Sequence, residues 1–84
     1  MTRFTVTWHP EAEAELTELW LSGSDRNEIA AAVGAIDVTL SVDATSKGQD
    51  VAEGLRSLNS PPLRVLFVVR ESDRVVQIEL VRRL

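Results

Sequence analysis

Arginine is the residue type of this sequence best suited to chemistry, and most of it lies in the last third of the chain. Guanidinium groups bind carboxylates and phosphates through paired hydrogen bonds, and they can stabilise negative charge that develops during phosphoryl transfer. The arginines flank two apolar runs with the alternation of antiparallel strands, 63–70 and 74–83, around a polar turn at 71–73. The arginines concerned are Arg64, Arg70, Arg74, Arg82 and Arg83. We expect a hairpin that contacts an anion or a partner. The alternative for Arg64 and Arg70 is a structural role, in ion pairs with Glu79 across the strands.

Other chemically capable side chains are scarce. The sequence has no cysteine, which excludes a disulfide framework and a thiolate metal site, and its one histidine cannot form a zinc centre alone. His9 could move protons near neutral pH, but its position before Pro10 is explained most simply by a helix start. We therefore expect no metal and no cofactor.

Length and charge limit the function further. The 84 residues, 44% of them hydrophobic, predict one domain over 1–84 with a single core, small enough for a partner or a second copy to add needed stability. A net charge of −4 argues against a general nucleic-acid binder. Residues 1–43 hold eight acidic and two basic side chains, whereas residues 44–84 hold seven basic and five acidic ones.

No apolar run is long enough for a signal peptide or a membrane span, so we expect a cytoplasmic protein without a membrane partner.

The first half predicts a strand followed by two helices. Alternation over 4–8 indicates the strand, and Pro10 opens a helix that runs to about residue 21 with an apolar stripe and an acidic outer face. The chain has two tryptophans, Trp8 in the expected strand and Trp20 in the expected first helix, and we expect both in the core or in a subunit interface. After the break at 22–24, Asp25 and Glu28 have the spacing of a capping box, and helical periodicity continues to residue 40. The short link predicts an antiparallel helical hairpin.

The second half predicts three strands after a long mobile loop at 41–54. A weak strand covers 55–58, and the two strong strands follow the Asn-Ser-Pro-Pro break at 59–62. The order β-α-α-β-β-β predicts an α+β domain, in which the helical hairpin packs on one face of a small, mostly antiparallel sheet. Strict alternation places one set of residues in the core: Leu63, Val65, Phe67, Val69, Val76, Ile78 and Leu80.

The same alternation leaves a second sheet face that nothing in the chain fully covers. We expect it to be half apolar and half cationic, and to bind a partner or another subunit. Its expected members are Arg64, Leu66, Val68, Arg70, Gln77, Glu79, Val81 and Arg83, with Arg82 beside them at the end of the chain.

The whole chain resembles the RelE/ParE toxin superfamily of type II toxin–antitoxin systems, which includes plasmid-stabilisation proteins. The resemblance rests on the order of elements, on Trp8-His9-Pro10-Glu11-Ala12 before the first helix, and on Pro62-Leu63-Arg64-Val65-Leu66-Phe67 at the central strand. It implies a cognate antitoxin as partner. RelE-type members cleave mRNA in the ribosome, and ParE-type members inhibit DNA gyrase, so ribosome, mRNA and gyrase are targets if the chain is active.

For the RelE-type reaction, the resemblance assigns Arg64 to the central-strand arginine of the catalytic site. Arg56 lies near the basic residues of the preceding strand, and Arg83 or Arg82 near a C-terminal arginine. The sequence departs from this pattern: it has no tyrosine and one lysine, Lys47, and it stops where the family's catalytic C-terminal segment would begin.

These departures favour a toxin-like component that acts through protein contacts or has weak or lost activity. The first alternative is a non-toxic dimeric interaction module on the same fold, for which the partner is a second copy. The second is a ribosome-dependent mRNA endoribonuclease that uses arginines alone, against which the negative net charge weighs.

Overall fold

The structure is a computed structural model that describes residues 2–84, and it contains two α-helices and five strands. The elements are β1 (Thr5–Trp8), α1 (Pro10–Ser22), α2 (Arg26–Leu40), a short 3-10 helix (Ala44–Ser46), β2 (Gln49–Ala52), β3 (Leu55–Ser60), β4 (Leu63–Arg70) and β5 (Val75–Arg83). The expected α+β class and the β-α-α-β-β-β order are confirmed. One expectation was wrong, because the segment 41–54 is not an unstructured loop: it contains the 3-10 helix and the additional strand β2.

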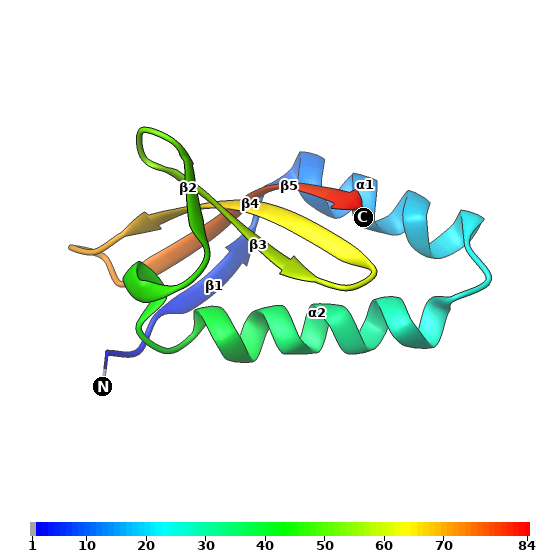
Figure 1. Cartoon of the computed structure of the whole chain (residues 1–84), viewed down its shortest axis with the longest axis horizontal. Helices are drawn as coiled ribbons and strands as arrows, with labels where there is room; N and C mark the ends of the chain where they lie inside the picture. Colours follow the sequence, from blue (N-terminus) through cyan, green and yellow to red (C-terminus); the bar gives the residue numbers. More distant parts are fainter. Residues whose placement is uncertain (1) are drawn as a thin grey trace.

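The strands form one sheet in the order β1-β5-β4-β3-β2. β2 pairs with β3, β3 with β4, and β4 with β5, and all three pairs are antiparallel. β1 pairs in parallel with β5 and forms the edge of the sheet opposite β2. The central hairpin of β4 and β5 is the pair of strong strands that the alternation predicted. In Figure 1 the turn between β2 and β3 lies at the top of the view, away from α2, whereas β3 runs down toward α2.

The two helices start by different means. At α1, the His9 ring nitrogen Nδ1 accepts a hydrogen bond from the Glu11 backbone nitrogen at 3.1 Å, and Pro10 occupies the first turn. The expected capping box at α2 is absent, since the Asp25 side chain caps no backbone group there. It accepts hydrogen bonds from the Arg83 guanidinium instead.

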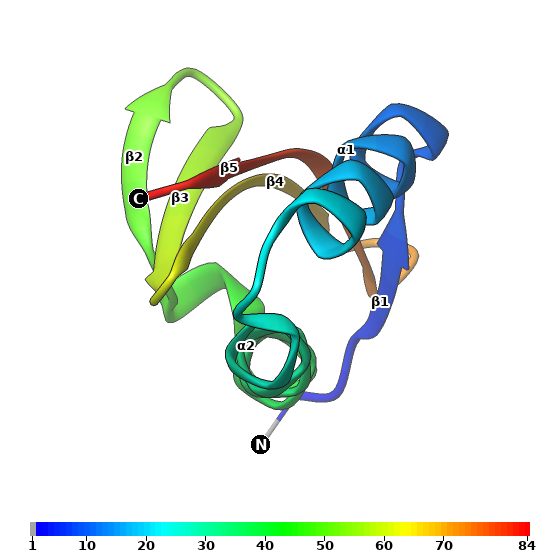
Figure 2. The same cartoon turned by 90° about the vertical axis from the view of Figure 1, so that its right-hand side faces the viewer.

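Both helices pack on the same face of the sheet. They run antiparallel in Figure 1, and Figure 2 shows α2 beneath the curved sheet, with α1 beside β1 and β5. The two helices and the strands β4 and β5 contribute most of the buried core, and Phe4, just before β1, and Ala44 complete it. The core residues of these helices and strands are Ala12, Ile29, Ala32, Ile36, Leu40, Leu63, Val65, Phe67, Val76, Ile78 and Val81. Trp8 packs against this core as expected, whereas Trp20 is 36% exposed. Among residues 2–84, no helix is both long and apolar enough to cross a bilayer.

A β-bulge in β5 changes which residues face the helices. Leu66 pairs with Leu80, but the next residue of β4, Phe67, pairs with Ile78, so Glu79 is the extra residue. The alternation of β5 therefore reverses after residue 79, and Val81 enters the core at 1% exposure. The expectations for three residues were wrong for this reason: Leu80 lies outside the core, and Val81 and Arg83 lie on the helix side.

Candidate functional site

The open face is the side of the sheet opposite the helices. Residues that pair across antiparallel strands share a face, so the pairing of β3, β4 and β5 identifies its members. They are Ser57, Asn59, Arg64, Leu66, Val68, Arg70, Val75, Gln77, Leu80 and Arg82. The predicted mixture of apolar and cationic side chains is therefore present, with Leu80 and Arg82 in place of Val81 and Arg83.

A groove of about 400 Å³ lies at one end of the open face. Leu66 and Leu80, which pair across β4 and β5, give it an apolar floor. Two exposed apolar side chains add to the walls: Val51, 48% exposed at the bulge of β2, and Leu84, 59% exposed. Its volume is within the range of ligand-binding pockets, about 300–1,000 Å³. The remaining lining residues are Arg64, Arg82 and Arg83.

Arg64 and Arg82 lie directly opposite each other on β4 and β5. Like charges at paired positions destabilise an antiparallel pair, and an anion between them removes the repulsion. Arg64 is exposed and makes no ion pair with any residue in 2–84. The two opposed arginines therefore line the same apolar groove, an arrangement that suits a carboxylate or a phosphate.

The Arg82 side chain also contacts α1. Its Nη1 atom donates to the Glu15 carboxylate and, at 3.0 Å, to the backbone oxygen of Val81. The Arg82 side chain is 57% exposed and that of Glu15 33% exposed. Arg82 lines both the groove and a second hollow on the helix side, which includes Glu18. It therefore lies at the boundary between the open face and the helices.

Arg83 joins the C-terminal strand to the start of α2. Its Nη1 and Nη2 atoms donate to the two Asp25 carboxylate oxygens at 2.6 and 3.3 Å. The hydrogen bond from Arg83 holds the pKa of Asp25 below its ordinary value, and the same bond raises the pKa of Arg83. This predicted site residue thus touches the groove but has a structural partner on the helix side.

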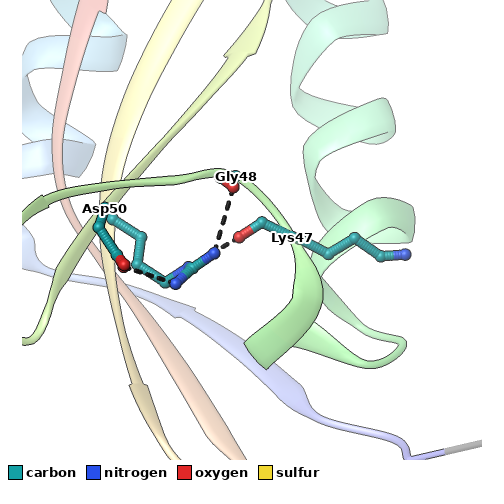
Figure 3. A network of polar contacts seen from close by, with 4 residues as sticks. Lys47, Gly48 and Asp50 are labelled. Atoms are coloured by element: carbon teal, nitrogen blue, oxygen red, sulfur yellow. Dashed lines mark hydrogen bonds and ion pairs between the residues drawn. The ribbon is translucent and has the colours of Figure 1, made fainter.

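Arg56 is hydrogen-bonded to the turn before β2 and to β2 itself. Its guanidinium donates to the backbone oxygens of Lys47 and Gly48 at 2.8 and 3.1 Å, and to the Asp50 carboxylate at 2.6 Å (Figure 3). Because Arg56 pairs with the core residue Phe67, it lies on the helix side of the sheet. The structure therefore does not bring it together with Arg64, and its geometry is that of a clasp for the turn.

The other expected contact residues lie further along the open face. Val68 and Arg70 share the face with Arg64, but Arg70 is six residues along β4, a distance of about 20 Å at the usual rise per residue. Neither lines the groove. Arg70 pairs with Val75 rather than with Glu79, which is the bulge residue, so the cross-strand ion pair with Glu79 is not formed.

Sequence reasoning missed four residues around this site: Val51, Leu80, Leu84 and Glu15. Val51 lies in a polar segment without clear periodicity. The bulge at Glu79, which turns Leu80 to the open face, cannot be detected from the alternation of apolar and polar residues in the sequence. The opposition of Arg64 and Arg82 could be found only from the register. No cluster of three or more metal-ligating side chains occurs in residues 2–84.

Comparison by sequence finds no matching protein-family profile and no curated relative. Comparison of the folds finds clear neighbours. A chain of the RelBE2 toxin–antitoxin complex from Mycobacterium tuberculosis superposes with a TM-score of 0.83 at 22% identity, covering 100% of this chain and 94% of that one. A chain of the chromosomal ParDE toxin–antitoxin system from P. aeruginosa gives 0.69 at 20% identity, with coverages of 98% and 97%. The isolated RelE toxin of E. coli gives 0.62 at 17% identity, with coverages of 95% and 83%. This chain therefore has the RelE/ParE fold.

Proposed function

We propose that this chain is the toxin-like component of a bacterial type II toxin–antitoxin pair, located in the cytoplasm, and that it acts through contacts with protein partners. The groove on the open face is the surface that a cognate antitoxin covers. The observation that carries this proposal is the opposition of Arg64 and Arg82 above the apolar floor formed by Leu66 and Leu80.

The shape and chemistry of this surface support a protein partner. The groove combines exposed apolar side chains with guanidinium groups, and arginines beside buried apolar contacts are characteristic of protein interfaces. The fold supports the same conclusion, because its neighbours include chains from complexes of toxins with antitoxins.

The arginine arrangement favours protein contacts over RNA cleavage. Of the expected catalytic set, Arg64 alone is exposed on the open face without an ion-pair partner in residues 2–84, while Arg56 and Arg83 are bonded to Asp50 and Asp25. The sequence has no tyrosine, and His9 caps α1 instead of facing the groove. Among residues 2–84, those that line the groove with Arg64 are valine, leucine and arginine, and none of them is a usual general acid or base for 2′-hydroxyl attack.

The test is induced expression in a bacterial host, with and without the product of any small reading frame that adjoins the gene. We expect growth to slow when the chain is produced alone and to recover when the neighbour is present. The neighbour product should co-purify with the chain, and Arg64→Glu should abolish this association because it reverses charge at the groove. Arg70→Glu is the matched control, since Arg70 is on the same strand and face outside the groove.

Other outcomes would contradict the proposal. Unchanged growth without any co-purifying neighbour, together with a dimeric mass in solution, would support the non-toxic dimeric module. Growth arrest with cleaved mRNA on ribosomes, lost in Arg64→Ala, would support the endoribonuclease. Equal effects of the two arginine reversals would mean that the groove is not the binding site.

A further inference from the structure

The groove has a feature that the proposed function does not require: one of its two opposed arginines already holds a carboxylate. Arg82 donates to Glu15, which α1 presents from the helix side, while Arg64 has no ion-pair partner in the described chain. We propose that the groove binds an acidic and apolar peptide segment whose carboxylate bridges Arg64 and Arg82, and that Glu15 is an internal competitor that lowers this affinity.

The position of Arg82 allows Glu15 and a carboxylate of the bound peptide to compete for the same guanidinium group. Arg82 lines the open groove and also the helix-side hollow that contains Glu15 and Glu18, and its guanidinium is bonded to Glu15. The Arg82–Glu15 pair is partly exposed, and exposed ion pairs are weak, so a better-placed anion can displace it. An anion that also neutralises Arg64 is better placed, because it relieves the repulsion between the two opposed arginines.

The aromatic residues indicate a peptide and not RNA. Single-stranded RNA is held by bases stacked on aromatic side chains, in addition to phosphate contacts. All four aromatic residues of the chain lie elsewhere: Phe4 and Phe67 are buried, Trp8 packs against the core and Trp20 is on α1. The floor of the groove is instead aliphatic, formed by Leu66 and Leu80. Leucine or valine side chains adjacent to a carboxylate match that floor.

This inference rests on the proposed function only for the origin of the segment, which would be the antitoxin. Its test therefore uses synthetic probes and the full chain. A fluorescein-labelled decapeptide of alternating leucine and glutamate is the binding probe, and the same peptide with glutamine is its uncharged control. Binding is followed by fluorescence anisotropy at low and moderate salt, and thermal melting monitors the fold of every variant.

We expect the glutamate peptide to bind and the glutamine peptide to bind at least tenfold more weakly. Arg64→Ala and Arg82→Ala should each weaken binding about tenfold or more, because each removes a charge-assisted hydrogen bond. Glu15→Gln should strengthen binding about two- to fivefold, the gain from releasing an exposed ion pair. In the Arg82→Ala background, Glu15→Gln should have no effect.

Glu18→Gln is the matched control for Glu15→Gln. It changes net charge equally and removes a neighbouring carboxylate of α1 that makes no ion pair in the described chain. If both variants strengthen peptide binding equally, the gain comes from the change in net charge and not from release of Arg82, and the role proposed for Glu15 is overturned. Equal binding of the two peptides, or tighter binding of a uridine decamer, would overturn the acidic peptide as occupant. The growth assay of the proposed function can fail while the peptide still binds, so the two failures are distinguishable.

Discussion

The bulge at Glu79 makes a quantitative prediction about two adjacent residues of β5. Strict alternation would bury Leu80 and expose Val81, whereas the observed register does the reverse. Val81→Ala removes two methyl groups from a side chain that is 1% exposed. At about 0.8 kcal/mol per group, with several tenths more for the cavity, unfolding should become easier by about 2 kcal/mol. Leu80→Ala removes a larger side chain, but one bordering an open groove, and should cost about 1 kcal/mol or less.

Urea unfolding followed by tryptophan fluorescence measures both values, because Trp8 packs against the core. For a domain of this size, the loss at Val81 corresponds to a fall in Tm of about 8–16 °C. Exchange to aspartate makes the contrast larger: Val81→Asp should prevent folding by burying a carboxylate, while Leu80→Asp should fold. A greater loss of stability from Leu80→Ala than from Val81→Ala would refute the bulge.

Three further predictions concern the supporting structure. Gly48→Ala should destabilise the fold by at least about 1–2 kcal/mol, because the residue has φ 71° and a β carbon there would collide with a backbone carbonyl of β3. Gly34→Ala, in the open interior of α2, should stabilise it by about 0.5–1 kcal/mol, and thermal melts compare the two. Arg56→Ala should cost about 1–3 kcal/mol in urea unfolding and speed amide exchange at 47–50, and unchanged exchange would refute the clasp. The lowered pKa of Asp25 means that its pair with Arg83 stabilises the fold above the ordinary carboxyl range, and that this stability is lost as pH falls through the lowered pKa. Arg83→Gln should raise the pKa of Asp25 toward its ordinary value in an NMR titration, and an unchanged value would contradict the assignment.

Local patterns were sufficient for most of the fold. Pro10, the periodic apolar residues of the helices and the alternation of β4 are short-range signals, and the structure confirms the elements that they predicted. The missed strand β2 has all four residues exposed, so no buried face marks it in the sequence. Its place depends on pairing with β3 and on the Arg56 clasp, which are contacts between separate segments.

The candidate site depended more strongly on such contacts. The sequence alone determined that a cationic and apolar hairpin would have one open face. Alternation defines two faces of the hairpin, and the two predicted helices are enough to cover only one of them. It also identified Arg64 and Leu66 as members of that face. Only the tertiary structure decided that Arg82 is the residue opposite Arg64, that Arg83 and Arg56 have carboxylate partners elsewhere, and that Glu15 reaches Arg82. The physical reason is that one extra residue in a strand reverses every side chain after it, and the register that fixes its position is a property of two strands together.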